Sequence, residues 1–264
     1  MKLAVTSCLF LITMVVTVAQ RPVLEETFER KRGELRQELE KHDQLEVVKG
    51  VGVDGGAAIR ATYVPSKRGS ERIVVSYPIK PALEYTLNYD VKFEKDFDFT
   101  HGGKLHGLGP DKPVTGGKAM RPDGWSARLM FAKAGGVRLY NYHQHLKGQY
   151  GDGGKVREKR YRFPKDQWVS VSLHVRVNKD FKAKDGFTKL YIDGQLIEER
   201  EDVQWRAAGR KDTMINQFLF STFHGGSTDK WTPRNKDGDW TEVHALFDNI
   251  AVYRGERIRK SPGS

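Results

Sequence analysis

The stretch L-E-Y-T-L-N-Y-D-V-K-F, residues 83–93, alternates between apolar and polar side chains. Its odd-numbered positions carry Leu, Tyr or Val and end in Phe, while its even-numbered positions carry Glu, Thr, Asn, Asp and Lys. A period of two is the repeat of a β-strand, in which successive side chains point to opposite faces. The stretch therefore predicts a strand with one face against a core and one polar face.

Further strands are predicted along the rest of the chain. Residues 168–177 alternate in the same way, and residues 216–223 and 247–253 are also typical of strands. Within T-K-L-Y-I-D-G-Q-L-I-E-E, the pair Asp193-Gly194 indicates a two-residue hairpin turn. Because many strands occur without the spacing of βαβ units, we expect an all-β fold. The predicted architecture is an antiparallel β-sandwich of the jelly-roll type over residues 49–264.

The first 20 residues differ from the rest. A positive end at Lys2, an apolar run and small residues up to Ala19 predict a secretory signal peptide over residues 1–20. An uncleaved anchor is the alternative, but no second apolar run follows, so we expect no membrane attachment. The single cysteine, Cys8, lies in this segment. The mature protein is thus expected to be secreted, monomeric and without disulfides.

Residues 21–48 form a charged segment before the predicted strands. Leu24, Phe28, Leu35 and Leu39 recur at near-helical spacing, which predicts a short amphipathic helix that Gly33 weakens. The simplest interpretation is a solvated helix that packs on the main domain.

The chain is strongly basic, with a formal net charge of +11, which becomes +10 when the predicted signal peptide with Lys2 is removed. Outside cells, a basic protein more often meets an acidic polysaccharide than a nucleic acid. We therefore expect an anionic polysaccharide as partner and no nucleic acid. Charge that serves solubility alone is an equal alternative at this level.

Two segments around a glycine turn predict a hairpin with a polar face. Ser126 and Arg128 share one face of the first segment, and Arg138, Tyr140 and Tyr142 share one face of the second. If the two strands pair, these side chains line one surface. Arginines beside tyrosines suit a ligand that is anionic and carries hydroxyls, although an ordinary amphipathic hairpin has the same pattern.

The stretch T-H-G-G-K-L-H-G-L-G, residues 100–109, is interpreted as a glycine-rich loop around Lys104. It lacks the spacing of a phosphate-binding loop. The glycines would let a ligand approach the backbone while the lysine reaches it. His101 and His106 flank the lysine and could exchange protons, although a hydrogen-bonding role without catalysis is the more usual one.

Several separated motifs, in order, resemble polysaccharide lyase family 14, which includes alginate lyases. They are G-G-K-L-H-G-L (102–108), W-S-A-R-L-M-F (125–131), L-Y-N-Y-H (139–143), S-T-F-H-G-G-S-T-D-K-W (221–231) and F-D-N-I-A-V-Y (247–253). The resemblance spans residues 51–256. It implies a jelly roll with a substrate cleft across its concave sheet. Two departures are the missing disulfides and the charged N-terminal segment.

The resemblance also implies which residues act on substrate. It assigns functional roles to Lys104, Ser126 and Arg128 and to the two tyrosines, Tyr140 and Tyr142. A lyase removes the C5 proton of a 4-linked uronic acid and expels the C4 oxygen. Arg128 would neutralise the carboxylate, while a tyrosine whose pKa is lowered by nearby cations would transfer the proton. We expect Tyr142 in that role and Tyr140 in support.

The remaining expected roles concern binding. Ser126 and Arg138 would contact substrate beside Arg128, and neither a metal nor another cofactor is required. His143 and His145 could form half of a metal site, but no third ligand is apparent. The basic run that begins at Lys155 could grip a polyanion at the rim.

Other functions remain open from the sequence. The substrate is expected to be polymannuronate (alginate), with a β-1,4-glucuronan as the alternative. A non-catalytic polysaccharide-binding module could share the fold, although it would not need two tyrosines beside Lys104 and Arg128. A glycoside hydrolase would need two facing carboxylates, and the predicted site offers none.

Overall fold

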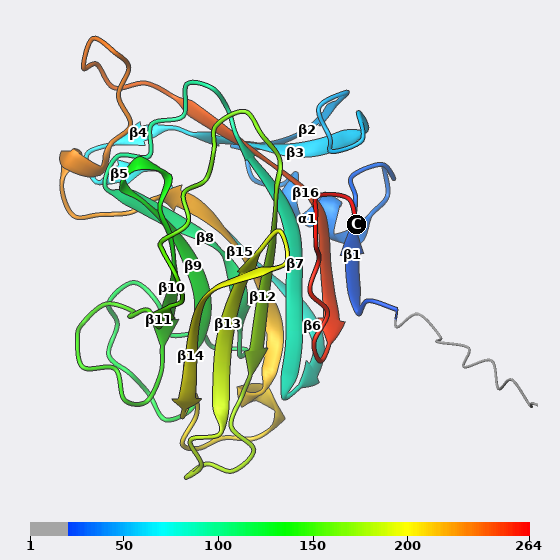
Figure 1. Cartoon of the computed structure of the whole chain (residues 1–264), viewed down its shortest axis with the longest axis vertical. Helices are drawn as coiled ribbons and strands as arrows, with labels where there is room; N and C mark the ends of the chain where they lie inside the picture. The colour runs from blue at the N-terminus through cyan, green and yellow to red at the C-terminus, as the bar shows by residue number, and fades with distance from the viewer. Residues whose placement is uncertain (1–20) are drawn as a thin grey trace, which may run out of the picture.

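Two antiparallel sheets make up most of the molecule, as the computed structural model shows for residues 21–264 (Figure 1). The predicted signal peptide, residues 1–20, lies outside the described residues. From residue 21 onward, no helix is long and apolar enough to cross a membrane.

The larger sheet has nine strands. One of them, β1 (Leu24–Glu26), pairs only with β16 and lies off the main strand order. Its remaining strands, in spatial order, are β11 (Lys155–Val156), β14 (Gln195–Val203), β13 (Gly186–Ile192), β12 (Val169–Arg176), β7 (Glu84–Phe93), β16 (Val243–Arg254), β3 (Ala57–Tyr63) and β2 (Leu45–Lys49).

The smaller sheet has five strands. In spatial order they are β10 (Val137–Tyr142), β9 (Ser126–Ala132), β8 (Gly102–Gly109), β15 (Ile215–His224) and β6 (Ile73–Ala82). The short elements are the hairpin of β4 (Pro65–Ser66) and β5 (Gly69–Ser70), the helix α1 (Glu34–Leu39), and the 3₁₀ turns η1 (Lys133–Gly135), η2 (Lys211–Thr213) and η3 (Asp229–Trp231).

The core lies between the two sheets and is rich in aromatic side chains. Phe93 of β7 and Phe131 of β9 meet edge to face with ring centroids 5.7 Å apart. Phe97 packs against both rings. Offset and edge-to-face arrangements are the favoured geometry for such pairs. The sandwich is therefore held by direct contacts between the apolar faces of both sheets.

The strands predicted from alternation are confirmed. Residues 83–93 correspond to β7, and residues 168–177 to β12. Asp193 and Gly194 both have positive φ, 46° and 80°, between the paired strands β13 and β14. Two consecutive residues with positive φ are what a type I′ hairpin turn requires. The predicted all-β antiparallel sandwich is correct.

The short helix predicted within residues 21–48 is present, but the segment around it is not helical. Only Glu34–Leu39 is helical, while Leu24–Glu26 and Leu45–Lys49 are strands of the larger sheet. Leu35 and Leu39 are buried one turn apart, which explains the helical spacing of the apolar residues. The rest of the segment pairs with β16 and β3, because backbone hydrogen bonds to an existing sheet outweigh a weak helical tendency.

The predicted glycine-rich loop at residues 100–109 is a strand instead. Residues 102–109 form β8, between β9 and β15. A Cβ atom at Gly103 would clash with the ring of Phe131, and one at Gly107 would lie 2.6 Å from Cγ of Arg128. These glycines therefore give space to neighbouring side chains rather than to a ligand.

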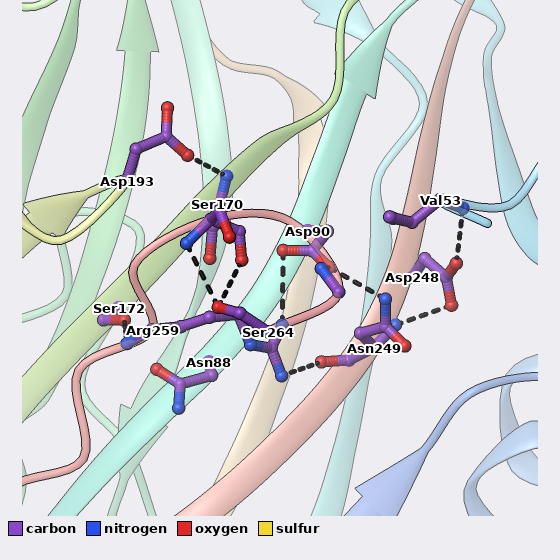
Figure 2. A network of polar contacts seen from close by, with 12 residues as sticks. Val53, Asn88, Asp90, Ser170, Ser172, Asp193, Asp248, Asn249, Arg259 and Ser264 are labelled. Atoms are coloured by element: carbon purple, nitrogen blue, oxygen red, sulfur yellow. Dashed lines mark hydrogen bonds and ion pairs between the residues drawn. The ribbon is translucent and has the colours of Figure 1, made fainter.

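The polar face of β7 is covered rather than solvated. The C-terminal tail, residues 255–264, crosses the sheet there, and Thr86 and Asn88 donate hydrogen bonds to its carbonyl groups. Asp90, which has no exposed surface, forms a 3.2 Å ion pair with Arg259 of the tail and accepts a hydrogen bond from Asn249 (Figure 2). The alternation predicted this strand's polar face correctly, but not what lies over it.

Replacing Arg259 by alanine is expected to lower the free energy of unfolding by about 3 kcal/mol, since it leaves the buried carboxylate of Asp90 without its cation. Urea denaturation measures this change. The neighbouring exposed Lys260→Ala removes the same charge and should change stability little. Equal stabilities of the two variants would show that the ion pair does not hold the tail.

Candidate functional site

A cleft of about 490 Å³ crosses the face of the smaller sheet that points away from the core. Alternation along the strands produces this division. On β8, Leu105 enters the core while Lys104 lines the cleft, and on β9, Leu129 enters the core while Arg128 lines the cleft. Strands β6, β10 and β15 contribute further side chains to the lining.

The cleft is basic throughout. Its lining includes five basic side chains and no Asp or Glu; the basic side chains are Arg68, Arg72, Lys104, Arg128 and Arg138. Such a concentration of one sign focuses a positive potential and attracts anions. The cleft is therefore suited to a ligand with several negative charges.

Arg68 and Arg72 are functional candidates that sequence reasoning missed. They flank the hairpin strand β5 and the start of β6, where no periodic pattern marks a face. Tyr150, 56% exposed and also in the lining, was missed for the same reason. The only signal of Arg68 and Arg72 in the sequence is the pair of arginines in R-G-S-E-R, residues 68–72.

Lys104 occupies an unusual environment for an ammonium group. Its Nζ lies 3.6 Å from the ring centroid of Tyr140 and 3.1 Å from Sδ of Met130. Burial, followed by repulsion from Arg128, Arg138 and Arg72, lowers the pKa of Lys104 to about 6. The side chain is therefore largely a neutral amine at neutral pH, which makes it able to accept a proton.

Arg128 is 4% exposed, and two of its donors are unused. Nε and Nη2 have no hydrogen-bond partner among residues 21–264. A buried guanidinium without partners costs free energy. Since Arg128 lines the cleft, an anion that enters it would satisfy these donors in a bidentate contact.

Tyr140 also lines the cleft, and it differs from the expectation in one respect. Burial is the largest cause that raises its pKa well above the usual value, followed by the hydrogen bond with Tyr142. The nearby Arg128 lowers this pKa but does not offset burial. The expectation of a tyrosine with a lowered pKa is therefore wrong for Tyr140. Its hydroxyl keeps its proton and can serve as an acid.

Ser126 and Tyr142 are brought to the same hairpin but lie behind the cleft. Both are fully buried, and neither lines the cleft. The Ser126 hydroxyl donates a 2.8 Å hydrogen bond to the carbonyl of Val114, and the Tyr142 hydroxyl accepts one of 2.8 Å from the amide of Gly117. These two contacts anchor the loop of residues 110–124, which forms one wall of the cleft.

The two tyrosines are themselves in contact. Tyr140 and Tyr142 point to the same side of β10, and their hydroxyl oxygens lie 3.3 Å apart. Tyr142 therefore connects the anchored loop to the hydroxyl that faces the cleft. The geometry favours Tyr140, not Tyr142, for direct contact with a ligand.

The predicted pairing of the hairpin is confirmed. Tyr140 lies opposite Arg128, and Tyr142 lies opposite Ser126. Arg138 lines the cleft as expected, with Nη2 3.7 Å from Sδ of Met130. The arrangement brings Lys104, Arg128, Arg138 and Tyr140 together.

Other predicted candidates lie elsewhere. His106 is buried in the core against Phe220, and burial lowers its pKa to about 3. His143 is buried and contacts Asp152 at 3.1 Å. The basic run from Lys155 does not line the cleft. Among residues 21–264, no three His, Cys, Asp or Glu side chains form a group that could hold a metal ion.

Chemically, the cleft combines a neutral amine, a protonated phenol and an unpaired guanidinium. An amine with a lowered pKa suits a general base, and a phenol that keeps its proton can donate it to a leaving oxygen. The guanidinium suits a carboxylate next to the reacting atoms. The site can therefore transfer protons beside a bound carboxylate.

The sequence matches the model of polysaccharide lyase 14 over residues 75–242. This span contains every residue that lines the cleft except Arg68, Arg72 and Val74. No curated protein matches the sequence.

Solved structures of similar fold include three polysaccharide lyases. A double mutant of the alginate lyase Aly36B, in complex with an alginate tetrasaccharide, has a TM-score of 0.71 at 21% identity and covers 89% of this chain and 99% of its own. The PL-14 alginate lyase from Aplysia kurodai has a TM-score of 0.59 at 23% identity, with 80% and 87% covered. An endo-β-1,4-glucuronan lyase from Trichoderma reesei has a TM-score of 0.53 at 17% identity, with 83% and 90% covered. At these identities the likeness shows the fold.

Replacing Tyr142 by phenylalanine removes the acceptor of the Gly117 amide. Because one hydrogen bond contributes about 1 kcal/mol, the Gly117 amide is expected to exchange with solvent about fivefold faster. Amide hydrogen exchange measures this rate. Tyr150→Phe is the control, as its hydroxyl makes no hydrogen bond within the described chain. Unchanged exchange in Tyr142→Phe would refute the anchoring role.

Proposed function

Because the chain belongs to polysaccharide lyase family 14, we propose that it cleaves polymers of 4-linked uronic acids by β-elimination. The observation that carries the proposal is Arg128. Two of its donors are buried and unpaired, and the residue lines a cleft that contains five basic side chains and no carboxylate. A polymer with one carboxylate on every sugar supplies the charge that this cleft lacks.

The first step of the proposed reaction is removal of the C5 proton. The carboxylate at C5 binds Arg128, which withdraws negative charge as the enolate-like anion develops. The neutral amine of Lys104 takes the proton and becomes an ammonium. The pKa of Lys104, lowered to about 6, supports this role over one for Tyr140, whose pKa is raised.

The second step breaks the bond between C4 and its oxygen. The electrons from the C5–H bond form the C4=C5 double bond, and the leaving oxygen takes a proton from the hydroxyl of Tyr140. Lys104 then holds one additional proton and Tyr140 lacks one, so return of a proton through solvent restores both. The positive charge on Lys104 stabilises the Tyr140 phenolate until then.

The geometry also favours one class of uronate. Lys104 Nζ lies over the ring of Tyr140, so base and acid approach the sugar from one side. In mannuronate and glucuronate, the C5 hydrogen and the C4 oxygen are on the same side of the ring. Polymannuronate, as in alginate, is the proposed substrate, in line with the alginate lyases of similar fold. A β-1,4-glucuronan is the alternative, in line with the glucuronan lyase.

Secretion is part of the proposal. The composition of residues 1–20 supports an extracellular enzyme, where polysaccharide is encountered. We further propose that it acts as a monomer, because a single chain supplies every cleft residue discussed here.

Digestion of polymannuronate is expected to yield oligosaccharides with a 4,5-unsaturated end, which absorb near the ultraviolet edge. Parallel digestion of β-1,4-glucuronan identifies the preferred polymer. Products with saturated ends alone, or no cleavage of either polymer, would refute the proposed function.

The pH dependence of the reaction tests the role of Lys104. Lys104 accepts a proton only when neutral, so kcat/KM is expected to rise with pH through about 6 and then level off. Arg138→Gln removes one cause of the lowered pKa and should move this rise to higher pH. Initial rates across the pH range measure both curves.

Substitutions complete this test. Lys104→Ala and Tyr140→Phe are expected to lower kcat by roughly two to four orders of magnitude. Tyr142→Phe should lower it less, since that residue does not face the cleft. Near-normal turnover in Tyr140→Phe would exclude it as the acid.

A further inference from the structure

A second basic pocket, of about 410 Å³, lies outside the cleft. It is lined by four cationic side chains from distant parts of the sequence, Lys133, Lys165, Lys230 and Arg234. A cavity of this volume is in the range of about 300–1,000 Å³ typical of ligand sites. None of the residues that carry the proposed reaction lines it.

The lysines of the second basic pocket have no partners. Within residues 21–264, the ammonium groups of Lys133, Lys165 and Lys230 make no ion pair or hydrogen bond. By contrast, Arg234 is engaged with Asp229 at 3.2 Å and with the carbonyl of Gly238. Three free positive charges therefore converge on one pocket.

The pocket contains one carboxylate, Asp98, and its oxygens are already used. Oδ1 accepts a hydrogen bond of 2.9 Å from the amide of Thr100, and Oδ2 accepts one of 3.0 Å from the amide of Arg234. Asp98 thus holds the backbone of the pocket in place. It reduces the positive charge but does not neutralise three lysines.

The second basic pocket adjoins the cleft through η3. Trp231 lines the cleft, while its neighbours in the chain, Lys230 and Thr232, line the pocket. The hydroxyl of Thr100 donates to the carbonyl of Trp231, and the ring of His101 packs 5.5 Å from the Trp231 ring. The cleft and the second basic pocket are therefore adjacent at Trp231 and Lys230.

We propose that the second basic pocket binds the carboxylates of a polyuronate chain outside the catalytic cleft. This inference rests on the proposed function, which makes polyuronate the ligand. Long chains then engage the cleft and the pocket together, and attachment at one site raises the effective concentration at the other. Short chains fill the cleft alone.

The experiment measures binding rather than turnover, on the full chain with Lys104→Ala to prevent cleavage. Affinity electrophoresis in gels with long polymannuronate, or with short oligomannuronate, gives the dissociation constants. The pocket variant adds Lys133→Ala, Lys165→Ala and Lys230→Ala. The control variant adds Lys179→Ala, Lys182→Ala and Lys184→Ala, which removes three exposed charges between β12 and β13.

The pocket variant is expected to bind the long polymer roughly three- to tenfold more weakly than the control variant, as exposed ion pairs each contribute modestly. Both variants should bind short chains equally. The difference for the long polymer should shrink as salt rises, because salt screens exposed charges.

Equal affinity of both variants for the long polymer would overturn the inference. An equal loss for short and long chains would also overturn it, since the lysines would then act on the cleft itself. Failure of the proposed function is seen separately, as absence of unsaturated products when Lys104 is intact.

Discussion

The site depends on one constraint, the placement of Lys104. Its ammonium group lies against the ring of Tyr140, among arginines and in a cleft whose lining has no carboxylate. A buried ammonium in such surroundings is unfavourable. Two events relieve it, loss of its proton or arrival of an anion. The proposed elimination would use both, because Lys104 as the base must first be neutral and must then hold a proton beside a negative charge. The unfavourable placement of Lys104 in the folded protein thus favours the protonation changes that the proposed reaction requires.

This placement requires a rigid support, and the aromatic core supplies it. Phe131, between Arg128 and Arg138 on the hairpin, is packed against Phe93 of the opposite sheet. Since alternate residues of a strand point to opposite faces, fixing the apolar residues in the core also fixes the cations in the cleft. Gly107 completes the arrangement, because any larger residue there would displace the stem of Arg128.

The motif residues fall into two layers with different duties. Lys104, Arg128 and Tyr140 face the cleft, whereas Ser126 and Tyr142 hold the loop that forms its wall. The two layers are connected, because the hydroxyl of Tyr142 contacts both the anchored loop and the hydroxyl of Tyr140. Resemblance to a family therefore indicates which residues belong to a site, while contacts indicate which of them face the cleft.

The sequence by itself determined the strands β7, β12, β15 and β16, the hairpin at Asp193-Gly194 and the set of side chains on the face of β9 and β10, because these depend on local periodicity and turn chemistry. It did not determine that residues 100–109 form a central strand, that Arg68 and Arg72 reach the cleft, or that residues 255–264 cover β7. It also led to the wrong pKa direction for Tyr140. These features depend on burial and on contacts between distant segments. Only the tertiary structure decides them, because desolvation and packing are properties of the folded surroundings and not of a residue's neighbours in the chain.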